Sequence, residues 1–259
     1  MEEKMDLLLK NGLVVTENEC KRVDIAVKNG KIAGLLERGS KTCCSEKEID
    51  CQGKVILPGA IDTHSHFFEP GEPSKYRDDF YTATMAAAAG GYTTCIEMPQ
   101  SIPPVVNKEA FLLKKKLATE KAVVDFALWG GLVPSSLDKI KELKEEGCVA
   151  FKAFTSDAGP DYEMCSDYDL LEGMKIVKAV GGLVGIHAEN DSICRKMTEY
   201  YRGMKTICPE YHEASRPWYA ELEAVSRCIL WSRITECPVM ICHLSIPEGA
   251  EQIKKEKED

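Results

Sequence analysis

Hydrophobic and polar positions alternate over short stretches near the start of the chain, which is the pattern of half-buried β-strands. The dipeptides Asn11-Gly12 and Asn29-Gly30 separate these stretches, and such pairs favour tight hairpin turns. We therefore expect a small β unit over residues 1–54, with strands at 6–10, 23–28 and 31–36.

From about residue 55 onward, strand-like and helix-like hydrophobic patterns follow one another in turn. We expect strands at 55–61, 92–98, 122–128, 148–154, 183–188 and 238–244. We expect helices at 78–89, 107–121, 136–146, 169–180 and 217–236, and a last helix that opens at 245–248. Six strand–helix units in succession predict an α/β fold with a parallel sheet and helices outside it. A (β/α)8 barrel is the natural candidate, and 55–259 would supply about six of its units, so we interpret the chain as part of a longer one.

Two histidines lie close together in the stretch LPGAIDTHSHFFEP, residues 57–70. Side chains alternate with period two along a strand, so His64 and His66 are expected to point to the same face. Two imidazoles on one face can bind one metal ion. The alternative is a pair of polar residues on a half-exposed strand. Because the pair follows an apolar run and Asp62, we favour a metal-dependent enzyme.

Two further histidines close predicted strands, His187 at the end of the fifth strand of the barrel-like region (183–188) and His243 at the end of the last. A barrel places its catalytic groups at the C-terminal ends of its strands, so four histidines at three strand ends indicate metal ligands. Imidazole with oxygen ligands suits zinc, with manganese, cobalt or iron as alternatives. We interpret His212 as a loop or surface residue. Glu189 and Asn190 either orient ligands or substrate, or start a helix.

Lys152 lies inside the otherwise apolar stretch 148–154. One interpretation is a side chain that reaches along the apolar surface to solvent. The other is a buried amine, whose pKa falls because desolvation favours the neutral form. A neutral amine can capture carbon dioxide as a carbamate, an anionic group whose two oxygens can bridge two metal ions. With four histidines at strand ends, we favour the second interpretation.

Composition narrows the class of protein. The 259 residues are 44% hydrophobic, which is enough for a sizeable core, and the formal net charge is −9. The one short lysine run, 114–116, is interpreted as a solvated helix face, so nucleic acid and anionic membranes are not expected as partners. Twelve cysteines without C-x-x-C spacing favour reduced thiols in a cytoplasmic protein. Neither a signal peptide nor a run of ~20 apolar residues is found.

Several short motifs together resemble those of the cyclic amidohydrolases, the family of allantoinase, dihydroorotase and dihydropyrimidinase or hydantoinase. They are DTHSH (62–66), EPG (69–71), GGYTTCIEMP (90–99), GGLV (130–133), FKAF (151–154), HAEN (187–190), SRP (215–217) and CHLSIPEG (242–249). The resemblance implies a metal-bearing (β/α)8 barrel and a small β-sandwich built from both chain ends, with 1–54 as its N-terminal portion and 55–259 as the catalytic metal domain. It also implies a dimer or tetramer.

The resemblance assigns roles to the strand-end residues. His64 and His66 would hold one divalent metal, His187 and His243 the other, and N6-carboxylated Lys152 would bridge the two. A metal-activated hydroxide would attack the ring amide, whose carbonyl a metal polarises. In the family an aspartate after the eighth strand moves the proton to the leaving nitrogen, whereas here the only aspartate beyond His243 is Asp259.

The motifs are most similar to those of allantoinases, which open allantoin to allantoate. Dihydroorotases carry an arginine where Phe68 stands, and an asparagine where Glu97 stands. Hydantoinases place a tyrosine at the position of Asp157 to stabilise the oxyanion, so the oxyanion donor here has no candidate. Two alternatives stay open: a hydantoinase or dihydropyrimidinase type of enzyme, and an inactive metal-binding protein that lacks the eighth-strand aspartate.

Overall fold

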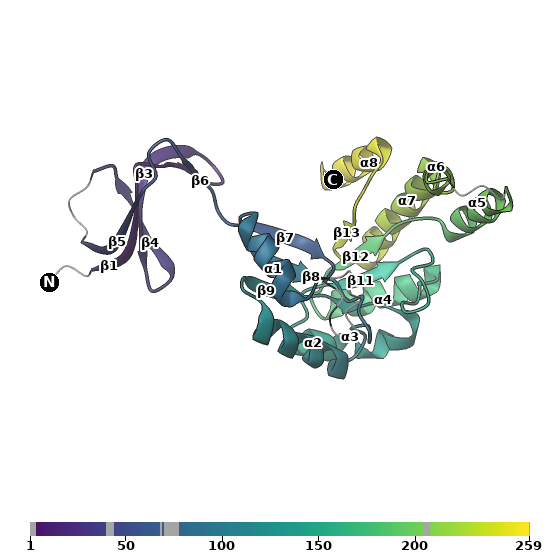
Figure 1. The fold of residues 1–259 in the computed structure, drawn as a ribbon. Helices are drawn as coiled ribbons and strands as arrows, with labels where there is room; N and C mark the ends of the chain where they lie inside the picture. The colour runs from purple at the N-terminus through teal and green to yellow at the C-terminus, as the bar shows by residue number, and fades with distance from the viewer. Residues whose placement is uncertain (1–3, 40–43, 68, 70–77, 205–207, 259) are drawn as a thin grey trace. The chain divides into compact units, whose positions relative to one another are not determined.

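The computed structural model describes residues 4–39, 44–67, 69, 78–204 and 208–258 (Figure 1). Two compact units make up the chain, Met1–Ala60 and Ile61–Asp259. The EPG motif at 69–71 and Phe68 lie mainly outside the described residues, as does Asp259.

The first unit is a β-sheet of strand order β5-β1-β3-β2-β6, in which β4 also pairs with β3. Its strands are β1 (Met5–Lys10), β2 (Leu13–Val15), β3 (Cys20–Lys28), β4 (Lys31–Glu37), β5 (Ser45–Asp50) and β6 (Val55–Ile56). Leu8, Val14 and Ile25 are buried in this unit. The small β unit expected at the start of the chain is therefore present.

The two predicted turns of this unit differ. Asn29 and Gly30 have φ of 51° and 71° and close a two-residue hairpin between paired Lys28 and Lys31, as expected. Asn11-Gly12 does not form a hairpin, because β1 and β2 both pair with β3 and not with each other. The dipeptide interrupts one edge of the ladder, a role that depends on a partner strand remote in sequence.

The second unit alternates strands and helices. Its strands are β7 (Ala60–Ser65), β8 (Tyr92–Glu97), β9 (Asp125–Leu128), β10 (Gly130–Gly131), β11 (Phe151–Phe154), β12 (Val184–His187) and β13 (Val239–Ile241). They form sheets of order β7-β8-β9 and β10-β11-β12-β13, and the pairings from β8 to β9 and from β10 to β13 are parallel. The chain continues directly from β9 into β10, and the hydrogen bond from Val149 N to Leu128 O at 3.1 Å joins the residues before β11 to β9, so the ladder continues from one sheet to the other.

The helices pack outside the strands, as the α/β pattern predicts. They are α1 (Phe80–Ala89), α2 (Lys108–Lys121), the 3₁₀ helix η1 (Pro134–Lys139), α3 (Ile140–Glu145), α4 (Asp167–Ala179), α5 (Asp191–Gly203), α6 (Glu210–Ala214), α7 (Trp218–Thr235) and α8 (Pro247–Glu258). Helices α1, α2, α3 and α7 contact β8, β9, β10 and β13 respectively (Figure 1). Phe111, Phe151 and Met174 are fully buried between strands and helices. The result is an α/β half barrel.

Two parts of the barrel-like unit differ from the sequence prediction. The strand expected at 55–61 is instead two strands, because β6 pairs with β2 of the first unit and β7 starts only at Ala60. Pro58 between them has no N–H to donate to a ladder. Helices α5 and α6 were not predicted. The apolar residues of α5, Ile193, Cys194, Met197, Tyr200 and Tyr201, do recur at helical spacing, so the sequence contained a signal for this helix that the prediction missed.

Candidate functional site

The first pair of histidines lies at the end of β7. His64 belongs to the strand and His66 follows its last residue by one. Their Nε2 atoms are 3.2 Å apart. Two nitrogens bound to one tetrahedral zinc at about 2.0–2.1 Å are about 3.3 Å from each other. The observed spacing therefore fits two ligands of one metal ion.

The other two strand-end histidines continue this arrangement. His187 is the last residue of β12, and His243 follows β13 by two residues with a φ of 42°. The ring centroids of His64 and His243 are 5.3 Å apart, and those of His187 and His243 are 4.8 Å apart. The structure thus brings all four imidazoles into one continuous row, from β7 across β13 to β12.

Lys152 lies in β11 with a side chain that is 0% exposed. It does not reach solvent, and its Nζ has no hydrogen-bond partner among the described residues. Nζ lies 4.6 Å from the centroid of the Phe154 ring, and the Phe154 ring stacks on that of His187 at 5.0 Å. Burial lowers the pKa of Lys152, and the neighbouring Cys242 thiol opposes that shift. A buried amine without a hydrogen-bond partner is uncommon in folded proteins and calls for an explanation.

Burial first, and then the charge of Lys152, lower the pKa of three of the histidines, His64, His66 and His243, to about 4. These rings are therefore neutral near pH 7, the form in which imidazole binds metals. Among the described residues, no group of three or more His, Cys, Asp or Glu side chains has the geometry of a complete metal site. Two features contribute to this result. The fifth candidate ligand is a lysine, which is not one of these four residue types. In addition, Nε2 of His187 is already hydrogen-bonded to Glu189, at 2.6 Å.

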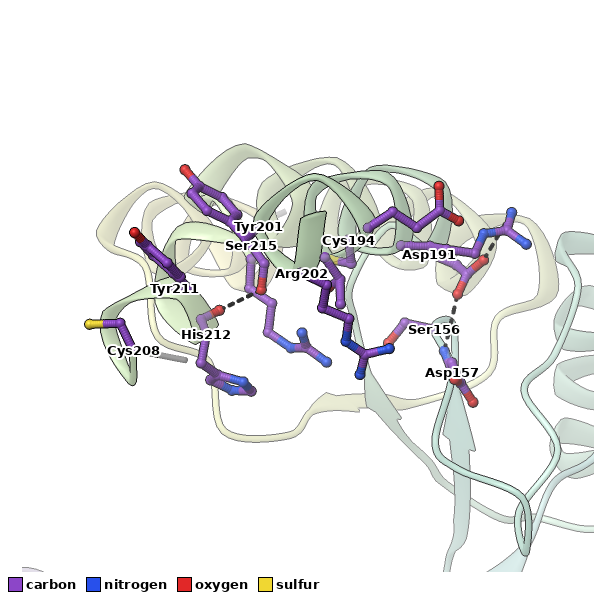
Figure 2. Close-up of a pocket in the computed structure, with 14 residues that line it drawn as sticks. Ser156, Asp157, Asp191, Cys194, Tyr201, Arg202, Cys208, Tyr211, His212 and Ser215 are labelled. Atoms are coloured by element: carbon purple, nitrogen blue, oxygen red, sulfur yellow. Dashed lines mark hydrogen bonds and ion pairs between the residues drawn. The ribbon is translucent and has the colours of Figure 1, made fainter. Parts of the chain in front are cut away.

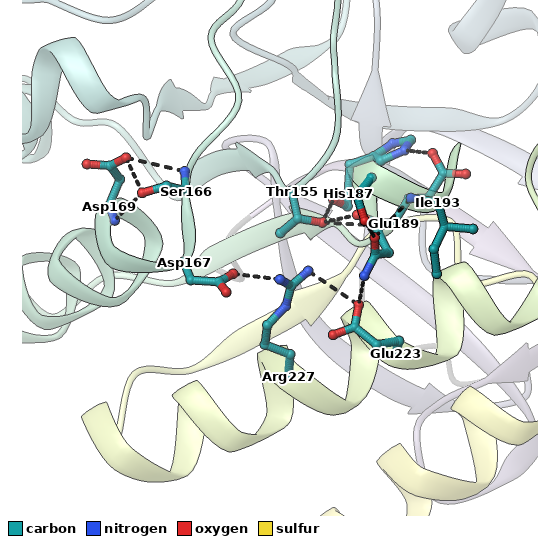
Figure 3. Close-up of polar contacts among 11 residues, drawn as sticks. Thr155, Ser166, Asp167, Asp169, His187, Glu189, Ile193, Glu223 and Arg227 are labelled. Atoms are coloured by element: carbon teal, nitrogen blue, oxygen red, sulfur yellow. Dashed lines mark hydrogen bonds and ion pairs between the residues drawn. The ribbon is translucent and has the colours of Figure 1, made fainter. Parts of the chain in front are cut away.

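A polar network holds the end of β12 (Figure 3). Thr155 Oγ1 donates to the carbonyl oxygens of His187 at 3.1 Å and Glu189 at 2.8 Å. Asn190 caps α5 and donates to Glu223 on α7 at 2.6 Å. Asn190 therefore starts a helix, and Glu189 contacts a strand-end histidine, so each of the two interpretations of this pair describes one of its members.

Glu189 is also linked to a residue of the SRP motif (215–217) to which the sequence analysis gave no role. Arg216 Nε lies 3.5 Å from Glu189 Oε1. Burial acts to raise the pKa of Glu189, but the hydrogen bond and charge of His187 and the charge of Arg216 together lower it. The carboxylate is therefore ionised near pH 7.

Two cavities meet at this point. The smaller, about 220 Å³, is lined by His187, Glu189, Arg216 and His243, among others. The larger, about 1010 Å³, lies between α5, α6 and the segment after β11, where Asp157 lies (Figure 2). His212 and Arg216 line both cavities. His212 is exposed on α6, in line with the surface position expected from the sequence, but it also faces a cavity that the sequence did not reveal.

Comparison with known proteins relates this chain to hydrolases. The sequence profile of the amidohydrolase family matches residues 55–256. An allantoinase of Escherichia coli (strain HS) is 36% identical over 260 residues, which are 98% of this chain and 56% of the relative. The chain thus spans about half the length of the curated relatives that it matches.

Solved structures give the same result for the fold. The L-hydantoinase (dihydropyrimidinase) from Arthrobacter aurescens superposes with a TM-score of 0.92 at 32% identity, covering 98% of this chain and 56% of that one. A dihydropyrimidinase from Brevibacillus agri superposes with a TM-score of 0.87 at 27% identity, covering 98% and 55%. No helix among the described residues combines the length and apolar composition that crossing a bilayer requires.

Proposed function

Because the chain belongs to the amidohydrolase family, we propose that it forms the metal-binding part of a hydrolase that opens the ring of a cyclic amide. The observation that carries this proposal is the row of four imidazoles beside the buried, unpartnered amine of Lys152. A structural role alone does not account for a buried lysine without a hydrogen-bond partner, since such a group destabilises the fold.

Each predicted site residue has a place in this proposal. His64 and His66 would hold one divalent ion, and His187 and His243 would hold the second. Neutral Lys152 would attack carbon dioxide through Nζ and lose a proton, giving an N6-carboxylated side chain that bridges the pair. We propose zinc as the metal at both positions, with manganese, cobalt or iron as alternatives. When bound, they would supply an activated water and polarise the ring carbonyl.

Groups of the chain itself would then receive the substrate. Hydrolysis of a cyclic amide produces a carboxylate where the ring carbonyl stood. Arg216, which lines both cavities, is placed to pair with such a carboxylate or to donate to a carbonyl oxygen. The small cavity beside His187 and His243 would hold the ring, and the large one would hold whatever the ring carries.

For the substrate, we propose allantoin, which is converted to allantoate when its hydantoin ring opens. Allantoin carries a ureido arm on its ring, and this arm would extend toward Arg216 and His212. The similarity to an allantoinase at 36% identity supports this choice. Hydantoins and dihydropyrimidines are the second candidate, supported by the similarity of the fold to the L-hydantoinase structure.

The remaining proposals concern the whole protein. The sequence expectation divided the chain at 54/55; because β6 (Val55–Ile56) pairs with β2, we assign the first unit, Met1–Ala60, to the N-terminal portion of a β-sandwich and the second unit to the barrel portion. We propose a homodimer or homotetramer in the cytoplasm that acts on a small cyclic ureide and binds neither nucleic acid nor membrane. The free thiols of the described cysteines support a reducing compartment.

Elemental analysis of purified protein tests the metal assignment. The double variant His64→Ala/His66→Ala should lose one divalent ion per chain, whereas His212→Ala should keep both, because His212 lies outside the row. Equal metal content in the three proteins would refute the ligand assignment. Turnover of allantoin, hydantoin and dihydrouracil by the metal-loaded wild type then distinguishes the candidate substrates. Metal binding without turnover of any of them would favour a non-catalytic metal-binding protein.

A further inference from the structure

A fully buried ion pair lies next to the first pair of histidines. Glu97 ends β8 and Lys114 lies on α2, and both side chains are 0% exposed with Nζ and Oε1 3.1 Å apart. The sequence prediction was wrong here, because Lys114 was assigned to a solvated helix face together with its two neighbours. Among those three lysines, Lys114 is the one that α2 turns toward the core, where Phe111 is also buried.

The Glu97 carboxylate contacts the main chain directly beside His66. Both of its oxygens accept the N–H of Phe67, at 3.0 and 2.9 Å. Phe67 is buried and lies two residues beyond the end of β7, so within the described residues its N–H takes part in no strand pairing of β7. A carboxylate is a strong acceptor for such a group.

Lys114 completes a second connection on the other side of His66. Its Nζ donates to the carbonyl oxygen of Met98 at 2.5 Å, and the N–H of Met98 donates to the carbonyl oxygen of Ser65 at 2.9 Å. The residues immediately before and after His66 are therefore both hydrogen-bonded, one to Met98 and one to Glu97. Lys114 binds both of these partners.

Stability does not account for this arrangement. Removing two charges from water costs several kcal/mol per ion, and apolar residues of similar volume often serve as well or better in such a position. What apolar residues cannot supply is an acceptor for Phe67 N–H at a fixed point. We propose that Glu97 and Lys114 are positioning residues that fix the main chain around His66, so that its imidazole meets His64 at the spacing that one metal ion requires.

This inference rests on the proposed metal centre, so its test measures metal binding directly. In both double variants Glu97→Gln/Lys114→Met and Glu97→Met/Lys114→Met, the buried charges are gone and the side-chain volumes nearly match. They differ in one respect, since glutamine can accept the N–H of Phe67 and methionine cannot. The zinc affinities of the full chain are measured by competition with a chelating dye, and thermal unfolding of the metal-free proteins is followed in parallel.

The glutamine double variant loses the Lys114 bond to Met98 but keeps an acceptor for Phe67 N–H, so its zinc affinity should lie between those of the wild type and the methionine double variant. The methionine double variant should bind one zinc ion per chain about 10–100-fold more weakly, which is the usual effect of losing a residue that holds a metal ligand in place. Equal affinities in the two double variants would overturn the proposal. If the wild type itself binds no zinc, or if His64→Ala/His66→Ala binds as the wild type does, the metal assignment fails instead.

A variant that keeps the ion pair covers the case in which the methionine double variant does not fold. Glu97→Asp retains the charge beside Lys114 but withdraws the carboxylate from Phe67 by one methylene. It should lower the affinity for the same zinc ion, and an unchanged zinc affinity would contradict the positioning role. Lys121→Met is the matched control, because it breaks the neighbouring pair with Glu69, which accepts the N–H of Phe80 and not that of Phe67. It should leave zinc binding unchanged.

Discussion

Nε2 of His187 lies 2.6 Å from Oε2 of Glu189, so the carboxylate already occupies one nitrogen of this ring. An ionised carboxylate can only accept a hydrogen bond, so Nε2 of His187 carries the proton. The ring is then the tautomer in which Nδ1 has no proton. Nδ1 is thus the nitrogen left free by this contact, and Glu189 orients the ring. This carboxylate–histidine pair is a common support of metal sites.

Glu189→Gln should therefore lower the affinity for the zinc ion proposed to bind His187 and His243 by about 10-fold, because the amide is a weaker acceptor than the carboxylate. The measurement is zinc competition with a chelator on the metal-free protein. Glu223→Gln is the matched control, since Glu223 belongs to the same network through Asn190 but does not contact His187. A loss of equal size in both variants would show that the network as a whole, and not Glu189, matters.

Lys152 and Lys114 are both fully buried, yet they lead to opposite expectations. Lys152→Met removes a buried amine without a partner, so the metal-free protein should become about 1–3 kcal/mol more stable. The same variant should bind less metal.

Lys114→Met leaves the Glu97 carboxylate buried and uncompensated, so it should destabilise the protein by about 3–5 kcal/mol. Urea unfolding of the metal-free proteins measures both, and a destabilised Lys152→Met would contradict the account of its amine.

The residues predicted from the sequence are those whose position follows from local periodicity. His64, His66 and His187 lie where alternating side chains and strand ends place them. The role of Arg216 was not foreseen, because its contact with Glu189 depends on where α6 and α7 bring it. Lys114 was misassigned because the apolar stripe of α2 is narrow, so the sequence does not show which lysine faces inward.

The same limit explains the strand boundaries. A hydrophobic run such as that before Pro58 has the composition of a strand, but its partner strand decides which sheet it joins. Here β6 pairs with β2 of the first unit, and the strand that bears His64 begins after Pro58. The Asn11-Gly12 dipeptide was misread for the same reason, since β3 is the common partner of both flanking strands. Local chemistry predicts the elements, and remote pairing decides their roles.

Gly185 lies on β12, two residues before His187, and has no room for a side chain. A Cβ built there would lie 2.6 Å from Trp129 Cζ3 and 3.2 Å from Cys242 Sγ. Trp129 is buried, so it cannot move away freely. Gly185→Ala should therefore destabilise by about 1–3 kcal/mol. Gly203→Ala is the control, because no atom of the described residues lies within 4 Å of a Cβ built at Gly203.

Gly203→Ala should stabilise α5 by up to about 1 kcal/mol, since alanine has the higher helix propensity. Thermal unfolding of the two variants under identical conditions measures the difference. A Gly185→Ala protein as stable as the wild type would mean that Trp129 or β12 shifts to make room. Such a shift would appear as an altered zinc affinity, because β12 carries His187.

Asp79 gives the first helix of the barrel-like unit a pH-dependent contribution. Its side chain accepts the N–H of Thr82 at 2.8 Å and forms a capping box with that residue. The hydrogen bond from the Thr82 backbone lowers the pKa of Asp79 below its ordinary 3.8, while burial opposes the shift. A carboxyl group whose pKa is lower in the folded state binds fewer protons there than in the unfolded state. Its stabilisation is therefore complete above the unfolded pKa and is lost as the pH falls through the folded pKa.

Near neutral pH, Asp79→Ala should destabilise by about 1 kcal/mol, because the first turn of α1 loses its cap. In acid below the folded pKa of Asp79, the difference from the wild type should shrink, since the protonated carboxyl is the weaker acceptor. Asp79→Asn should keep most of the cap at both pH values, because its amide oxygen can accept the same N–H. Urea unfolding of the three proteins at the two pH values measures this. A difference between Asp79→Ala and the wild type that stays constant with pH would show that the charge of Asp79 contributes nothing to the cap.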